Sequence, residues 1–143
     1  MWRWREEHTA AIATLGVPLK LDVSLPQRAI ASFLADLQAI DAPSPTIVFG
    51  HLGDGNLHVN FPDCFSAGAE PTDFVHELEA SVLQLVASHG GSISAEHGIG
   101  VAKVGYLPLT RSPAEIAAFR RLKDAFDPAG ILNPGVLLPV TVR

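Results

Sequence analysis

The order of the predicted elements between residues 18 and 94 constrains the fold more than any other feature of this sequence. Strands are indicated by short runs of alternating character, and helices by apolar residues that recur at helical spacing. The predicted strands are 18–25, 46–51, 58–61 and 92–94, and the predicted helices are 27–40 and 72–89. The resulting order, β-α-β-β-α-β, is that of the ferredoxin-like arrangement. We therefore predict an α+β fold with a four-stranded antiparallel sheet and both helices on one face.

Further helices are predicted on either side of this core. Residues 2–15 carry apolar positions at helical spacing, and Gly16 follows as a stop. Capping boxes begin at Ser24, before the helix 27–40, and at Ser112, before a helix that runs to about Phe126. We expect a leading helix, the ferredoxin-like core and a C-terminal helical tail, with residues 62–71 forming a loop.

Composition and charge exclude several classes of protein. With 48% hydrophobic and 17% charged residues, the 143-residue chain has the make-up of one folded domain. Its net charge of −5 argues against nucleic acid as a partner, and no apolar run approaches the roughly 18 residues of a membrane span. The single cysteine, Cys64, favours a reducing cytoplasm. The mean hydropathy of +0.25 indicates apolar surface for another domain or subunit, with a homo-oligomer as one alternative.

A glycine-rich turn at residues 53–56 joins the second and third predicted strands and indicates a hairpin. If Asp54 and Gly55 form the centre of the turn, His51 lies directly opposite His58. Directly opposed residues have Cβ atoms roughly 4.5–5.5 Å apart, so both imidazoles can bind one metal ion at about 2.0–2.1 Å. The alternative is that both histidines are ordinary polar residues at a strand edge.

Alternation along the two strands separates their side chains into two faces. One face carries polar and aromatic groups, and the other carries only apolar groups that should pack on the helices. The polar face is predicted to hold Phe49, His51, His58 and Asn60, and the apolar face Val48, Leu52, Leu57, Val59 and Phe61.

A third metal ligand is expected from another segment, because two histidines rarely suffice for a divalent ion. Glu96 is the best candidate, since it follows a predicted strand, adjoins His97 and lies among glycines. The alternative is a solvent-exposed acid in a flexible loop. Asp54 is a weaker candidate, because aspartate is common in turns for conformational reasons.

Four motifs in this order resemble the C-terminal region of FAD-linked oxidases of the vanillyl-alcohol oxidase type. They are Trp2-x-x-Arg-Glu6 with Lys20-x-Asp-x-Ser24, His51-x-Gly-Asp-Gly-Asn-x-His58, Gly91-x-Ile-x-Ala-Glu-His-Gly-Ile-Gly100, and Asp127-Pro-x-Gly-Ile-Leu-Asn-Pro-Gly135. The resemblance is strongest to the branch of D-lactate, glycolate and D-2-hydroxyglutarate dehydrogenases, and it covers nearly the whole chain.

The resemblance implies a role for each matching residue. It implies that His51, His58 and Glu96 bind a divalent metal, zinc or manganese, and that His97 is the base that takes the substrate hydroxyl proton. It also implies that His97 and Asn133 lie near the flavin. The positions that it assigns to the substrate are Arg5, Thr9, Lys20 and Asn60.

The implied reaction is oxidation of a D-2-hydroxy acid to a 2-oxo acid, with FAD as the hydride acceptor. The chain 1–143 then corresponds to one substrate domain, with a leading helix at 1–16, a ferredoxin-like core at 17–95, and the active-site loop, helix and tail at 96–143. No glycine-rich phosphate loop follows a predicted strand. We therefore expect FAD to be held mainly by a domain or subunit outside this sequence. The alternative is a non-catalytic domain that binds metal or pairs with another subunit.

Overall fold

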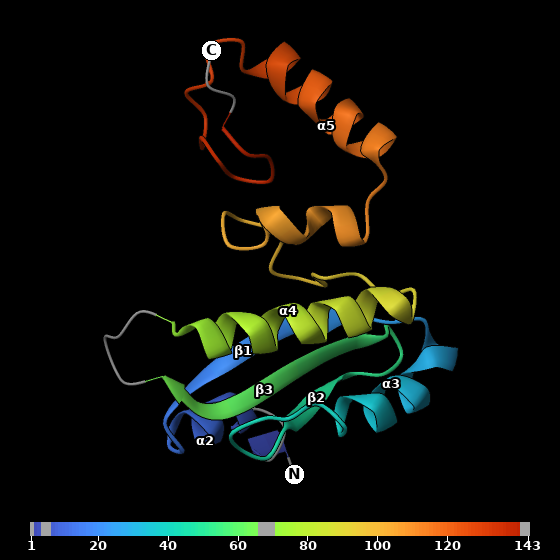
Figure 1. The fold of residues 1–143 in the computed structure, drawn as a ribbon, viewed down its shortest axis with the longest axis vertical. Helices are drawn as coiled ribbons and strands as arrows, with labels where there is room; N and C mark the ends of the chain where they lie inside the picture. Colours follow the sequence, from blue (N-terminus) through green and yellow to red (C-terminus); the bar gives the residue numbers. More distant parts are fainter. Residues whose placement is uncertain (1, 4–6, 66–70, 141–143) are drawn as a thin grey trace.

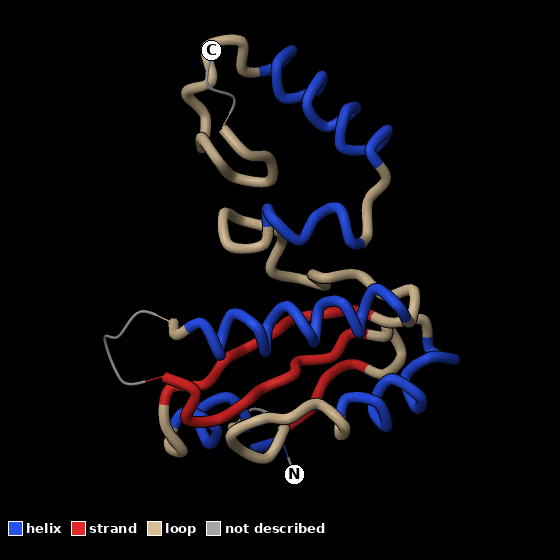
Figure 2. The backbone as a smooth tube through the Cα atoms, viewed as in Figure 1, coloured by secondary structure: helices blue, strands red, loops and turns tan. Residues whose placement is uncertain are grey.

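Three strands form one antiparallel sheet at the centre of the fold. The computed structural model of the chain describes residues 2–3, 7–65 and 71–140. The strands are β1 (Val17–Ser24), β2 (Ile47–His51) and β3 (Asn56–Phe65), in the order β1-β3-β2 (Figures 1 and 2). The longest strand, β3, lies in the middle and pairs with both others.

Helices cover both faces of this sheet. In chain order the helical elements are α2 (His8–Ala13), η1 (Gln27–Ala29), α3 (Ile30–Leu37), α4 (Asp73–Ser88), η2 (Val104–Leu109) and α5 (Pro113–Phe126). Residues of α3 and α4 belong to the same hydrophobic core as the inward residues of β1 and β3. The predicted α+β fold, with these two helices on one face of an antiparallel sheet, is confirmed.

Alternation along the strands explains which face is apolar. Leu21 and Val23 of β1 and Val59 of β3 are at most 2% exposed and pack with Phe33 of α3 and Val82 of α4. Complete burial of such a side chain contributes about 1.5–3 kcal/mol. These apolar contacts fix the position of β3, which carries Asn56, His58 and Asn60 on the opposite face.

The opposite face of the sheet is polar and lies under α2. Cross-strand pairs align Lys20 with Asn60 and Asp22 with His58. The ring of His8, on α2, lies 5.2 Å from that of Phe49, on β2. The second face is therefore a polar surface with a helix beside it, as a binding site requires.

The predicted fourth strand is reduced to one bridge. The Ser24 N–H donates to the Ser92 carbonyl at 3.1 Å, and the Ser92 N–H donates to the Ser24 carbonyl at 2.8 Å. The expectation of a four-stranded sheet was wrong. After Ser92 the N–H groups of residues 95–97 bind the Asp22 carboxylate instead of the β1 backbone.

The loop predicted over residues 62–71 was wrong at its start. β3 continues to Phe65, which pairs with Val17, and the register shifts between Val17 and Leu19. The irregular stretch coincides with Pro18 and Pro62, which have no N–H to donate to a ladder.

Of the two predicted capping boxes, only the one at Ser112 is confirmed. The Ser112 hydroxyl accepts from the Glu115 N–H, and the Glu115 carboxylate accepts from the Ser112 N–H. Ser24 instead remains in β1, and η1 begins after Pro26 with no side-chain cap. In the described part of the predicted leading helix, residues 2–3 and α2 (His8–Ala13) are helical, and α2 ends before the predicted limit at Leu15.

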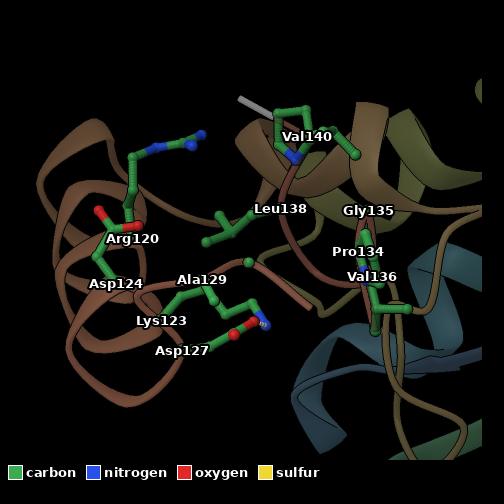
Figure 3. A pocket seen from close by; sticks show the side chains of 12 residues that line it. Arg120, Lys123, Asp124, Asp127, Ala129, Pro134, Gly135, Val136, Leu138 and Val140 are labelled. Atoms are coloured by element: carbon green, nitrogen blue, oxygen red, sulfur yellow. Dashed lines mark hydrogen bonds and ion pairs between the residues drawn. The ribbon is translucent and has the colours of Figure 1, made fainter. Parts of the chain in front are cut away.

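α5 and the tail extend away from the sheet, beyond η2 (Figure 1). At the end of α5, the Asp127 carboxylate accepts from Lys123 Nζ at 2.6 Å (Figure 3). It also accepts from the N–H groups of Ile131 and Leu132. The Lys123 ammonium, supported by those two N–H groups, lowers the pKa of Asp127 to about 2. This carboxylate therefore fixes the turn from α5 into the tail.

α5 buries little of its own surface. None of its residues is fully buried, and Phe126 is 82% exposed. Leu122, Ile131 and Leu132 add exposed apolar area. The apolar surface that the mean hydropathy indicates is concentrated here. No helix in the described ranges has the length and apolar character to cross a membrane.

Candidate metal and substrate site

The histidine hairpin has a wider turn than predicted. His51 pairs with Asn56 and Phe49 pairs with His58, so the expected pairing of His51 with His58 was wrong. Residues 52–55 form the loop, closed by the Asp54 N–H on the His51 carbonyl at 3.0 Å. Because the register differs by two residues, the face of each strand residue is unchanged.

The predicted polar face is confirmed. Phe49, His51, His58 and Asn60 share it, and Asn56 joins them from the end of β3. Leu52 is the exception on the other face, since it lies in the loop and is exposed rather than packed on the helices.

Contacts with the segment after β1 hold the wider turn. The Leu25 N–H donates to the Gly55 carbonyl at 2.9 Å, and Gln27 Nε2 donates to the Gly53 carbonyl at 2.6 Å. Gly55 has a positive φ of 72°, which glycine adopts at little cost. The turn is thus shaped by a neighbouring segment as well as by its own residues.

We expect Gly55→Ala to lower the free energy of unfolding by about 2–4 kcal/mol, because a Cβ there combines a left-handed backbone with overpacking. That Cβ would lie 2.0 Å from the Leu25 carbonyl oxygen. Gly53→Ala is the matched control, since a Cβ at Gly53 meets nothing within 4 Å. Urea denaturation followed by circular dichroism measures both. Equal stability of the two variants would contradict this explanation of the turn.

Three potential metal ligands converge beside the hairpin. One donor atom each from His51, His58 and Glu96 lies within 4.8 Å of the others. Two donors of one zinc ion lie up to about 4 Å apart, given bonds of about 2.0–2.1 Å, so small side-chain rotations suffice to close the set. Two imidazoles and a carboxylate suit zinc or manganese.

Asn56 connects the hairpin with Glu96. Its side chain is buried, and its Nδ2 donates to Glu96 Oε1 at 2.5 Å. Its Oδ1 is also buried and has no hydrogen-bond partner. The bond orients the Glu96 carboxylate toward the histidines, because Asn56 lies opposite His51 in the sheet.

Asp22 holds the loop that carries Glu96 and His97. Its Oδ2 accepts from the N–H groups of Ala95, Glu96 and His97 at 3.1, 2.7 and 2.9 Å. Burial alone raises the pKa of this carboxyl, but the three N–H groups and the nearby His97 outweigh burial, so the pKa lies below its ordinary value. Asp22 is therefore a carboxylate at neutral pH.

Lys103, the residue before η2, binds backbone carbonyls on both segments that Asp22 connects. Its Nζ donates to the Ile93 carbonyl at 2.7 Å and to the Asp22 carbonyl at 3.2 Å. Burial lowers the pKa of Lys103, while Asp22 and Glu79 act in the opposite direction. A cation thus joins β1 to the strand-like segment that precedes the Glu96 loop.

His97 lies next to the three potential metal ligands. Its ring stacks on that of His58, with centroids 6.1 Å apart. Its Nδ1 is 4.0 Å from Asp22 Oδ2, while 68% of the side chain is exposed. This arrangement leaves Nε2 available to a ligand beside the cluster.

A hollow of about 220 Å³ opens between α2 and the polar face of the sheet. Three of the predicted substrate residues, Thr9, Lys20 and Asn60, line it together with His97. The remaining lining residues are Leu21, Asp22, Phe49 and His58. A small acid in this hollow would lie against both His58, one of the potential metal ligands, and the Lys20 ammonium.

Comparison of the sequence with known protein families gives one match that covers nearly the whole chain. Residues 1–137 match the family described as FAD linked oxidases, C-terminal domain. The chain belongs to this family. Its resemblance to the FAD-linked oxidases, inferred from the motifs, is confirmed.

Curated relatives of this oxidase domain include two D-2-hydroxyglutarate dehydrogenases. The one from Xanthomonas citri pv. viticola is 48% identical over 96% of the chain and 30% of its own length. The mitochondrial one from Bos taurus is 40% identical over 97% of the chain and 25% of its length. A D-2-hydroxyglutarate–pyruvate transhydrogenase of Saccharomyces cerevisiae is 40% identical over 94% of the chain and 28% of its length. The chain thus spans less than a third of these relatives.

Of the remaining predicted site residues, only Asn133 can be compared with this cluster. Arg5 lies outside the described residues. Asn133 lies in the exposed tail, where its carbonyl accepts from the Val136 N–H. Among the described residues, no hydrogen bond or ring contact links Asn133 with His97. The tail does reach the loop of this oxidase domain, because the Leu137 N–H donates to the Gly100 carbonyl at 2.9 Å.

Sequence analysis assigned no role to Asp22, Asn56 or Lys103. For Asp22 the sequence does contain a signal, namely a carboxylate between Leu21 and Val23 in a strand whose alternate residues are apolar. Its partners could not be found from sequence, since they come from residues 95–97, far along the chain.

Proposed function

We propose that this chain is the substrate- and metal-binding part of a flavin-dependent dehydrogenase of D-2-hydroxy acids, with D-2-hydroxyglutarate as the substrate. The observation that carries the proposal is the convergence of His51, His58 and Glu96 beside His97, at a hollow that contains Lys20. The names of the relatives support the choice of D-2-hydroxyglutarate.

His51, His58 and Glu96 would hold the metal, zinc or manganese. When bound, such an ion supplies Lewis-acid polarisation of the substrate hydroxyl. FAD, which the family implies, supplies the hydride acceptor when bound, and we assign His97 and Asn133 to the surface that faces it. We place the FAD-binding domain or subunit outside this sequence.

The residues of the chain itself bind the acid and move its proton. His97 would accept the hydroxyl proton at Nε2, since its Nδ1 faces the Asp22 carboxylate. Lys20 would attract the distal carboxylate as a point charge. Thr9 and Asn60 would add polar contacts from the same hollow, and Arg5 would add a second cation. A reducing cytoplasm suits the single cysteine.

Titration of the chain with Zn²⁺, and separately with Mn²⁺, tests this proposal. We expect one ion to bind per chain, and D-2-hydroxyglutarate to bind at least about tenfold more tightly with the ion than without it, because an ion at this site adds a ligand for two substrate oxygens. L-2-Hydroxyglutarate is the matched control, which should gain less. A chain that binds neither ion, or both enantiomers equally, would contradict the proposal.

The exposed apolar surface of α5 favours a second function, that of a non-catalytic domain that pairs with another subunit. Both functions fit metal binding, but only the first gives stereospecific acid binding. The enantiomer comparison therefore separates them.

A further inference from the structure

We propose that Asp22 is the positioning residue of this site, with one carboxylate that orients both the metal ligand His58 and the loop that carries Glu96 and His97. The inference deepens the proposed function. The role of Asp22 toward His58 rests on the proposed metal site, whereas its role in holding the loop does not.

The loop that carries Glu96 and His97 is held by its backbone. Glu96 and His97 have exposed side chains, so packing does little to hold them. Their backbone N–H groups, with that of Ala95, all point at Asp22 Oδ2 at distances of 2.7–3.1 Å. Hydrogen bonds to a charged acceptor are about twice as strong as neutral ones. The position of the loop on the sheet therefore depends mainly on this one oxygen.

The other oxygen of the same carboxylate lies near His58. Asp22 Oδ1 is buried and has no hydrogen-bond partner among the described residues, yet it lies 3.6 Å from His58 Nδ1. A histidine that binds a metal usually donates its other ring N–H to a carboxylate, which fixes the ring orientation and the tautomer. A slight approach of the two groups would give Oδ1 its partner and direct His58 Nε2 to the ion.

Asp22 occupies a buried position in the sheet. Asp22 is 2% exposed and lies directly opposite His58 in the β1–β3 pair. A buried charge is costly unless it is paired, and Asp22 is buried on the polar face of β1, while its neighbours Leu21 and Val23 face the helices. The carboxylate is explained if it joins ligands from two distant segments.

Zinc affinity of Asp22→Asn and Asp22→Ala, measured by competition with a chromophoric chelator, tests the link to His58. Loss of such a partner typically lowers metal affinity about 10–100-fold, and we expect this for both variants. Asp36→Asn is the matched control, because Asp36 also pairs with a histidine, His89, at 2.9 Å, but lies outside the site. Its affinity should stay within about twofold of the native chain. Native affinity in both Asp22 variants would overturn the proposal.

Amide hydrogen exchange without metal tests the link to the loop. We expect the N–H groups of Glu96 and His97 to be protected in the native chain and in Asp36→Asn. Asp22→Ala should exchange them at least tenfold faster, while Asp22→Asn, which retains one acceptor oxygen, should be intermediate. Unprotected amides in the native chain, or full protection in Asp22→Ala, would overturn the proposal.

The two measurements separate the inference from the proposed function. A native chain that binds no zinc but loses Glu96 and His97 protection in Asp22→Ala would contradict the metal site and support the loop role of Asp22. A native chain that binds zinc, with unchanged affinity in both Asp22 variants, would support the metal site and contradict the role of Asp22 toward His58. If Asp22→Ala does not fold, the zinc affinity and amide exchange of Asp22→Asn, together with the amide protection in the native chain, decide between these outcomes.

Discussion

Replacing His58 with alanine is expected to weaken zinc binding by more than about 100-fold, because loss of even a partner of a metal ligand costs about 10–100-fold. His58 is the half-buried member of the three proposed ligands, and its ring contacts those of Phe49 and His97. Its position is therefore more restricted than that of exposed His51 or Glu96. Competition with a chromophoric chelator measures the affinity.

His89→Ala is the matched control for this substitution. His89 also contacts an aspartate and an aromatic ring, Asp36 and Phe33, but on the helical side of the sheet. It should alter stability without altering zinc affinity. Similar zinc affinities for His58→Ala and the native chain would contradict the assignment of the metal site.

Replacing His97 with glutamine is expected to lower turnover of D-2-hydroxyglutarate about 10²–10⁴-fold, the range that a general base contributes. The preparation must contain this chain together with its FAD-binding domain or subunit. The side chain is exposed beside the hollow and makes no contribution to the core. Reduction of an electron-accepting dye by the substrate measures turnover.

Metal affinity separates the loss of a base from the loss of the site. His97→Gln retains the backbone N–H that binds Asp22, so its zinc affinity should stay within a few-fold of the native value. A variant that loses zinc binding and turnover together would contradict the role of His97 as a base. Native turnover would contradict it as well.

The amino-acid sequence by itself determined which residues share a face. Alternation in β2 and β3 placed His51, His58 and Asn60 together, and it did so although the predicted turn was wrong. A shift of two residues preserves the face of each side chain. Periodicity likewise predicted α4, and the capping box at Ser112 predicted the start of α5, because both signals are local.

Only the tertiary structure decided the register, the place of Glu96 and the contacts of Asp22. The wider turn is held by Leu25 and Gln27 from another segment, and the predicted fourth strand is reduced to the Ser24–Ser92 bridge, after which the N–H groups of residues 95–97 bind the Asp22 carboxylate. Each of these outcomes is a competition between hydrogen-bond partners far apart in the chain. Local propensity cannot decide such a competition, since it depends on which acceptor the packed core brings within about 3 Å of each N–H.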